Sequence, residues 1–327
     1  MRTRQLGNSD LHLTRVGLGA WAIGGGDWAY GWGPQDDRQS IDGIHRALDL
    51  GINWIDTAAV YGLGHSEEVV ARALAGRRDK VMVATKCGLP WREGSRAVRP
   101  SLAAESIRRE AENSLRRLKL DVIDLYQIHW PSPARQIEEA WATIARLVQE
   151  GKVRHAGVSN FSVEQMRTAQ AIYPIASLQP PYSMIDRAVE EEILPFCAKN
   201  GIGVVAYSPM QSGLLTGAFD HERLDRLAPG DWRRKDSAFR EPVFSRALEL
   251  VDRLKLVAAR ADRTVAQLAI TWVLRRPEVT AAIVGVRRPQ QVEETAAAAD
   301  SELSGAELEE VDRILLEVAV PQPMPLR

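Results

Sequence analysis

The chain has 327 residues, 45% of them hydrophobic, and its 42 Lys and Arg nearly balance its 43 Asp and Glu. This charge balance provides no field to attract nucleic acid or an anionic membrane, so we expect a small-molecule substrate and predict no nucleic-acid, membrane or protein partner. The two cysteines form no metal-ligand pattern, and no apolar run resembles a signal peptide or a membrane span, which favours a cytoplasmic protein with free thiols and no metal.

In chain order, the sequence begins with a predicted β-hairpin that turns at residues 7–10, and then alternates short β-branched runs with amphipathic stretches. The predicted strands span residues 16–19, 52–55, 81–85, 122–128, 153–158, 175–178, 203–206 and 281–284. The predicted helices span residues 37–50, 66–75, 101–118, 135–150, 162–171, 188–199, 243–261 and 289–299, the third of them entered through Pro100 and Ser101 in a near capping box.

Eight strands that alternate with eight helices predict an α/β protein with a parallel sheet, and closure into a (β/α)₈ TIM barrel is the economical arrangement. Three pieces lie outside the repeat: a long loop at 208–242 after the seventh strand, an extra helix at 264–276, and an extra C-terminal element at 304–316. With no linker or composition shift, we expect residues 1–327 to form a single domain.

One dinucleotide-like motif is present near the N-terminus. Gly17 and Gly19, with Ala22, fit a relaxed dinucleotide-binding fingerprint after a strand. That fingerprint requires a helix to start at once over the phosphates, whereas here three more glycines follow. We therefore disfavour a doubly wound dinucleotide fold.

Four polar residues follow the ends of predicted strands. Asp56 ends the run INWI, Lys86 ends VMVAT, His129 ends DLYQI, and Tyr61 lies five residues after Asp56. Active sites of such barrels lie at the carboxyl ends of the strands, so these side chains can converge. Taken singly, three of them also have a structural interpretation. His129 could be a structural residue with its hydrogen bonds satisfied, Lys86 a surface charge, and Tyr61 a packed aromatic residue.

Together they would form a proton-transfer set. A free tyrosine has a pKa of about 10. A neighbouring ammonium should lower the pKa of Tyr61, and Asp56 should keep Lys86 charged despite burial. A neutral His129 could donate a hydrogen bond to a carbonyl oxygen.

The motifs around these residues resemble those of the aldo-keto reductase superfamily, and within it the bacterial general-stress and inositol-operon oxidoreductases. The resemblance covers residues 51–68, Thr85-Lys86, 124–130, 157–161, 179–182, 207–209 and 212–217. It implies reversible NADP(H)-dependent reduction of aldehydes, ketones or small sugars. Tyr61 would supply the proton, Lys86 and Asp56 would tune it, and His129 would polarise the carbonyl.

The resemblance also implies a cofactor site. Ser159, Asn160 and Gln179 would hold the nicotinamide carboxamide, and Tyr207 would stack on the ring. The pyrophosphate would lie along Ser208, Gln211, Gly213 and Leu214. The adenosine end would contact Gly285, Arg287, Gln291 and Glu294, with Arg287, and Arg288 as a helper, on the 2′-phosphate, which favours NADP(H).

The substrate pocket is expected to be walled by Trp21 and Trp130, with Trp28, Trp91 and Trp232 as further candidates on loops. Two alternatives remain open. The chain could be a cofactor-bound redox sensor or regulatory subunit with little turnover. It could also be a barrel hydrolase or isomerase that uses no nicotinamide.

Overall fold

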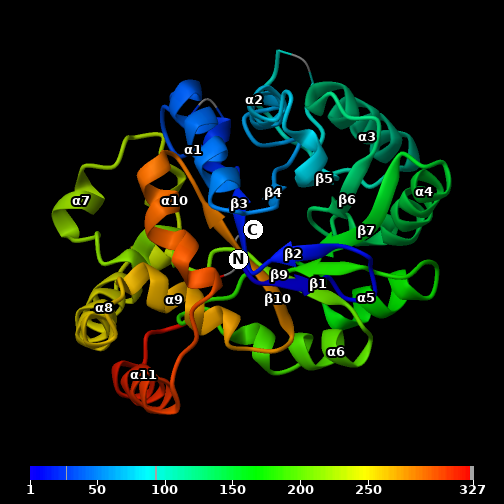
Figure 1. The fold of residues 1–327 in the computed structure, drawn as a ribbon. Helices are drawn as coiled ribbons and strands as arrows, with labels where there is room; N and C mark the ends of the chain where they lie inside the picture. Colours follow the sequence, from blue (N-terminus) through cyan, green and yellow to red (C-terminus); the bar gives the residue numbers. More distant parts are fainter. Residues whose placement is uncertain (27, 93, 325–327) are drawn as a thin grey trace.

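The computed structural model describes residues 1–324 except 27 and 93, and within them eight parallel strands close into a barrel (Figure 1). The strands follow one another around the barrel in chain order, and β10 closes it by pairing with β3. They are β3 (Val16–Gly19), β4 (Trp54–Asp56), β5 (Met82–Cys87), β6 (Ile123–Ile128), β7 (Val153–Ser159), β8 (Ser177–Gln179), β9 (Gly203–Ala206) and β10 (Val279–Gly285). The predicted (β/α)₈ barrel is confirmed.

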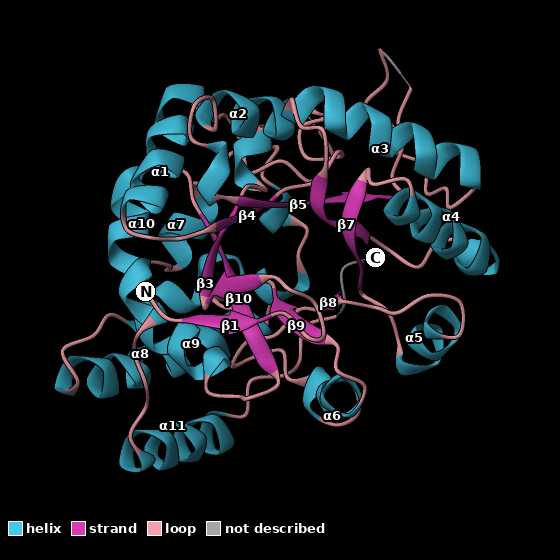
Figure 2. Ribbon diagram, turned by 45° about the vertical axis from the view of Figure 1, so that its right-hand side comes forward, coloured by secondary structure: helices cyan, strands magenta, loops and turns pink. Residues whose placement is uncertain are grey.

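Helices surround the strands on the outside, as Figure 2 shows. They are α1 (Asp37–Asp49), α2 (His65–Ala73), α3 (Ala104–Leu118), α4 (Ile137–Gln149), α5 (Val163–Gln170), α6 (Ile193–Lys199), α7 (His221–Asp225), α8 (Val243–Arg260), α9 (Val265–Leu274), α10 (Pro289–Ala296) and α11 (Gly305–Val318). The long connection after β9 contains α7 and short 3₁₀ turns, and α11 packs on α8. Among the described residues, no helix is long and apolar enough to cross a membrane.

An N-terminal hairpin closes one end of the barrel. Strands β1 (Thr3–Gln5) and β2 (His12–Thr14) pair antiparallel, which confirms the predicted hairpin. Leu6, Leu11 and Leu13 are at most 2% exposed and pack against a cluster that includes Trp54, at the start of β4. Because the amino ends of the strands are plugged, the opposite end is the one free for a site.

The glycines of the dinucleotide-like motif serve strand packing. A Cβ atom on Gly17 would lie 2.0 Å from the ring of Trp54, and one on Gly19 would lie 2.7 Å from Ile283. Neither position tolerates a side chain because a neighbouring strand's side chain fills the space. The motif therefore has a packing explanation inside the barrel wall.

Two predicted helices begin at least three residues later than expected. Residues 188–199 form a 3₁₀ turn at Ala188–Glu190 and then the short α6. Helix α3 begins at Ala104, and its N-cap Ala103 makes no side-chain cap. Ser101 is not the cap because its backbone N–H bonds to the Gly88 carbonyl, which holds this segment against the end of β5.

Candidate active site

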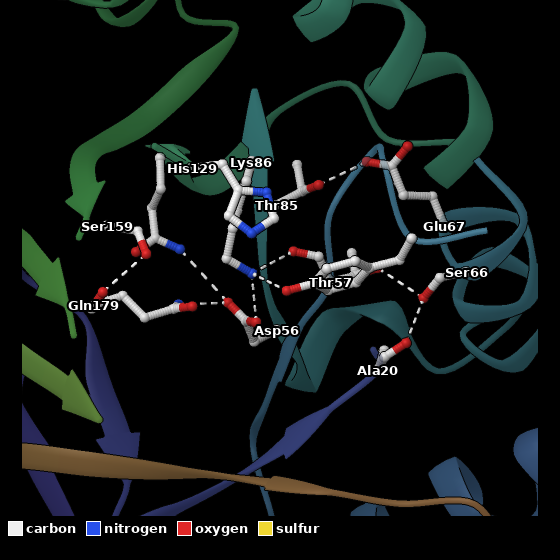
Figure 3. Close-up of polar contacts among 12 residues, drawn as sticks. Ala20, Asp56, Thr57, Ser66, Glu67, Thr85, Lys86, His129, Ser159 and Gln179 are labelled. Atoms are coloured by element: carbon white, nitrogen blue, oxygen red, sulfur yellow. Dashed lines mark hydrogen bonds and ion pairs between the residues drawn. The ribbon is translucent and has the colours of Figure 1, made fainter. Parts of the chain in front are cut away.

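The four polar residues predicted from the strand ends meet at the open end of the barrel, where Figure 3 shows Asp56, Lys86 and His129 together. Asp56 is the last residue of β4, Lys86 lies one residue before the end of β5, and His129 follows β6. Tyr61, on the loop between β4 and α2, lies with its ring edge-on to His129, the two centroids 5.6 Å apart. Adjacent parallel strands bring these side chains together, because β4 pairs with β5 and β5 with β6.

Lys86 is the centre of the cluster, and its side chain is fully buried. Its Nζ donates to Asp56 Oδ1 at 2.6 Å, to the Thr57 carbonyl at 2.9 Å and to Tyr61 Oη at 3.3 Å. An ammonium has three N–H groups, and all three are used here. The geometry therefore fixes the cation and leaves the Tyr61 hydroxyl proton unengaged by it.

The second carboxylate oxygen of Asp56, Oδ2, is approached by two side-chain amides. The Gln179 Nε2 donates to Asp56 Oδ2 at 2.8 Å, and the Gln127 Nε2 lies 3.5 Å from the same oxygen. Gln127 was not predicted from the sequence, although strand alternation offered a signal. Residues two apart on a strand share a face, so Gln127 points to the same side of β6 as His129 would.

Burial dominates the protonation of the cluster. It raises the pKa of Tyr61 well above its usual value, and the Asp56 carboxylate raises it further. This corrects the expectation of a lowered tyrosine pKa, because desolvation of the phenolate outweighs the attraction of the ammonium. Burial also lowers the pKa of Lys86, against the effect of Asp56, and lowers the pKa of His129 well below its usual value, with Lys86 adding to the effect. His129 is therefore neutral.

A second polar network lies behind the strand that carries Lys86. The Glu67 side chain is fully buried; its Oε1 accepts the Thr85 hydroxyl at 2.6 Å and its Oε2 accepts Arg117 Nε at 2.6 Å. The Arg117 guanidinium in turn lies over the ring of Trp91, 5.4 Å from its centroid. This network connects α2, β5 and α3 and fixes the residue before Lys86.

The residues expected around a nicotinamide form one hydrogen-bonded chain. Tyr207 Oη donates to Asn160 Oδ1 at 2.9 Å, and Asn160 Nδ2 donates to Ser159 Oγ at 3.0 Å. Ser159 Oγ donates to the Gln179 carbonyl at 2.8 Å. Through Gln179 the chain ends at Asp56, so the predicted cofactor residues and the proton-transfer cluster are directly joined.

The segment after β9 has an unusual backbone. Ser208, Gln211 and Ser212 have φ values of 55°, 45° and 53°, and Gly213 has 94°. Left-handed residues that are not glycine are uncommon and gather at functional sites, and successive backbone N–H groups in such turns form concave anion sites. The side chain of Leu214, by contrast, is fully buried, so any ligand would contact its backbone.

The predicted adenosine-end residues surround the exit of β10. Gly285 ends this strand with open space where a Cβ would be. The Arg287 backbone N–H donates to Gln291 Oε1 at 2.9 Å. Its guanidinium donates to Gln35 Oε1 at 2.7 Å and to the Pro34 carbonyl at 2.6 Å, both neutral acceptors. Glu294 is exposed on α10.

Arginines from two loops gather near this exit. Arg223 and Arg233 come from the long loop after β9, and Arg287 and Arg288 follow β10. Burial lowers the pKa of Arg287, and the positive charges of Arg233 and Arg288 lower it further, against the effect of Asp231. Arg233 is paired with Asp231 at 2.6 Å, whereas the acceptors of Arg287 among the described residues are neutral. A surplus of guanidinium charge of this kind suits an anionic ligand.

Aromatic rings cover the cluster around Lys86 and Tyr61. The ring of Trp21 stacks on Trp232 with centroids 4.8 Å apart and lies 6.2 Å from Tyr61. The Trp232 backbone N–H bonds to the Gly31 carbonyl, which joins the long loop to the loop after β3. Trp130 is half-buried beside His129 and takes no part in this stack within the described part of the chain.

Comparisons with known proteins agree with this geometry. The family model described as "Aldo/keto reductase family" matches residues 15–316. The aldo-keto reductase YhdN of Bacillus subtilis (strain 168) is 40% identical, over 99% of this chain and 96% of its own length. The NADH-specific methylglyoxal reductase of Escherichia coli (strain K12) is 37% identical, over 94% of this chain and 96% of its own.

A solved structure is similar over nearly the whole chain. The glycerol dehydrogenase AKR11B4 from Gluconobacter oxydans superposes with a TM-score of 0.88 at 40% identity. The match covers 99% of this chain and 98% of that one.

Proposed function

The chain belongs to the aldo/keto reductase family, and from that premise we propose that it is an NADP(H)-dependent enzyme that reversibly reduces aldehydes, ketones or small sugars to alcohols. The observation that carries the proposal is the Lys86 ammonium, which bonds to both Asp56 and Tyr61 at the open end of the barrel. Family members use a nicotinamide cofactor and act as oxidoreductases. The choice of NADP(H), the substrate range and the part played by Tyr61 are our proposals.

The residues of this chain fit a dinucleotide. The left-handed backbone at Ser208, Gln211 and Ser212 suits a pyrophosphate, and the surplus guanidinium charge around Arg287 suits a further phosphate. The amides of Asn160 and Gln179 would hold the carboxamide at the other end. When bound, the nicotinamide supplies the hydride.

Tyr61 is the proton donor in this proposal. Because Lys86 donates to Tyr61 Oη, the phenol's own proton is free to point at a substrate oxygen. The raised pKa of Tyr61 keeps that proton on the phenol at neutral pH. Lys86 then stabilises the phenolate that remains after transfer, and the buried Asp56 holds Lys86 in place.

His129 orients the carbonyl. Since its pKa is lowered well below the usual value, the ring is neutral and offers one N–H donor. A neutral donor polarises a carbonyl without competing with Tyr61 as an acid. The aromatic stack of Trp21 and Trp232 keeps water from this cluster.

The preference for NADP(H) rests on the arginines. Arg287 and Arg288 carry two guanidinium groups at the β10 exit, where a 2′-phosphate would be recognised by a fork of N–H donors. The relative from Escherichia coli is described as NADH-specific, so family membership alone does not decide this point. The charge surplus around Arg287 supports the phosphorylated cofactor.

Initial rates on a panel of aldehydes, ketones and aldoses, with NADPH and NADH in parallel, test the proposal. We expect turnover with a preference for NADPH, and a loss of that preference in Arg287→Ala. Arg276→Ala is the matched control, because Arg276 pairs with Glu278 at the amino end of β10, away from the site. Equal use of both cofactors would contradict the NADP(H) preference, and NADPH that stays unoxidised across the panel would indicate a sensor instead.

A further inference from the structure

A buried carboxyl group lies outside the proton-transfer cluster but touches the strand that carries it. Glu110 on α3 is 5% exposed and faces β5. Its Oε2 accepts the backbone N–H of Gly88 at 3.0 Å, and its Oε1 accepts the Ser106 hydroxyl at 3.1 Å. The backbone N–H of Leu89 also bonds to this carboxyl. Among the described residues, no lysine or arginine forms an ion pair with Glu110.

The surroundings of Glu110 contain few charges. The Cys87 thiol faces it from β5 and the Tyr126 phenol from β6, while Arg109 is its charged neighbour on α3. Burial raises the pKa of Glu110 to about 7, although the bonds from Ser106, Gly88 and Leu89 act in the opposite direction. Burial also raises the pKa of Cys87 and of Tyr126 well above their usual values, so both stay neutral. Glu110 is thus the group here that changes charge near neutral pH.

The two amides that Glu110 holds are the first of the loop after β5. Gly88 has a φ of 95°, and its carbonyl accepts the Ser101 N–H, so the loop returns on itself. Residues 91 and 98 form a bridge within this hairpin, whose described residues are 88–92 and 94–101. Gly88 follows Lys86 by two residues, and the intervening Cys87 carbonyl accepts the His129 N–H at 3.0 Å.

The hairpin forms a wall of the catalytic cluster. Leu89 and Val98 pack against the group of buried side chains that contains Tyr61 and Trp28. A movement of the Gly88 and Leu89 amides would therefore change the packing around Tyr61. It would also disturb the strand end between Lys86 and His129.

We propose that Glu110 is a positioning residue: its ionised carboxylate anchors the 88–101 hairpin against the catalytic cluster, and its protonation loosens that anchor. An ionised carboxylate only accepts hydrogen bonds, and bonds to it are roughly twice as strong as neutral ones. A protonated carboxyl is a weaker acceptor for Gly88 and Leu89. The hairpin should then be held most firmly above neutral pH.

The pH dependence of kcat/KM tests this role, and this readout rests on the proposed reductase activity. We expect wild-type kcat/KM to rise severalfold with an apparent pKa of about 7, mainly through KM. Glu110→Gln should lose the step and stay near the low-pH value, because glutamine resembles the protonated acid. A variant that keeps the step would overturn the proposal.

Two further variants sharpen the assignment. Ser106→Ala removes a donor that favours the carboxylate, so the step should move to higher pH. Glu105→Gln is the control, because Glu105 lies on the same helix with its side chain 91% exposed, and the step should stay unchanged. A step that fails to move in Ser106→Ala would count against Glu110 as its source.

Hydrogen exchange gives a readout that needs no substrate. After correction for intrinsic rates, the Gly88 and Leu89 amides should exchange about tenfold faster at pH 6 than at pH 8, since a charge-assisted bond is lost. Equal protection at both pH values would overturn the anchor even if the enzyme turns over. The predicted exchange together with absent turnover would refute the proposed function while leaving the anchor intact.

Discussion

The protonation of Tyr61 is decided by burial more than by its cationic neighbour. Lys86 Nζ lies 3.3 Å from Tyr61 Oη, yet the pKa of the phenol is raised because the phenolate would be desolvated and would face Asp56. At neutral pH the phenol is therefore protonated. A protonated phenol suits the proton-donor role that we propose for Tyr61.

Removal of the Tyr61 hydroxyl tests its part in turnover. We expect Tyr61→Phe to lower kcat by at least about 100-fold, the usual range for loss of a positioned proton donor. NADPH affinity, measured by fluorescence titration, should stay within a factor of about two, since the ring remains. Tyr173→Phe is the control, because Tyr173 lies between α5 and β8, at the plugged end. A near-normal rate in Tyr61→Phe would refute the assigned role.

The four central residues could be predicted from the sequence because they lie at or near the ends of predicted strands. The contacts made by residues on distant loops could not. Asp56, Lys86 and His129 lie at the carboxyl ends of three successive strands, so barrel topology alone brings them together. The direction of the Tyr61 pKa shift depends on how completely the aromatic rings bury its side chain. No local sequence pattern predicts that burial. Gln35 and Trp232 come from distant loops, and only the closed fold brings them to Arg287 and Trp21.

At the scale of elements, α3 shows why a sequence-local capping pattern failed. The first helical residue, Ala104, donates its backbone N–H to Glu139 Oε1 at 2.9 Å, and Leu102 N–H bonds to Gln136 Oε1 at 3.1 Å. Both acceptors come from the start of α4 rather than from residues beside α3. Side chains from another helix, rather than from a neighbouring residue in the sequence, accept these N–H groups. The pattern at Ser101 therefore could not predict where the helix begins. By contrast, the predicted helices 135–150 and 188–199 end within one residue of the expected position, where Gly151 and Gly201 adopt φ values of 74° and 65°.

The cap from α4 has a measurable effect on stability. We expect Glu139→Ala to lower the free energy of unfolding by about 1 kcal/mol, the typical cost of a lost helix cap. Glu138→Ala is a matched control, because Glu138 is also exposed in the first turn of α4 and favours the same helix dipole. Urea unfolding of both variants measures the difference. Equal losses would show that the bond to Ala104 adds nothing.

At the scale of the whole molecule, the apolar residues that close the barrel and the polar residues of the candidate site lie at opposite ends of the strands. The hairpin and its leucines close the amino ends of the strands, whereas Asp56, Lys86 and His129 lie at the carboxyl ends. This division was predictable from the alternating pattern, because parallel strands direct all their carboxyl ends to one face. Glu110 departs from the division, since it is a titratable group inside the layer between α3 and the barrel.

Glu110 should make global stability fall as pH rises. Its pKa is raised from 4.5 to about 7 in the folded protein, so between these values the native state holds a proton that the unfolded chain has released. Stability then decreases with pH, since its slope follows the protons bound by the unfolded state minus those bound by the native state. The contribution is complete below about pH 4.5 and is lost above about pH 7.

The stability of Glu110→Gln relative to wild type should therefore increase as pH rises from about 5 to about 8, because glutamine has no charge to bury. The increase in the free energy of unfolding should reach up to about 3 kcal/mol. Denaturant unfolding at both pH values measures the difference, and Glu105→Gln should show no such trend because its side chain is exposed. The same Glu110→Gln variant is expected to lose catalytic efficiency above neutral pH. If the Glu110 carboxylate destabilises the fold while it anchors the 88–101 hairpin, Glu110→Gln raises the stability and lowers kcat/KM above neutral pH. If Glu110 has only a structural role, the substitution lowers both.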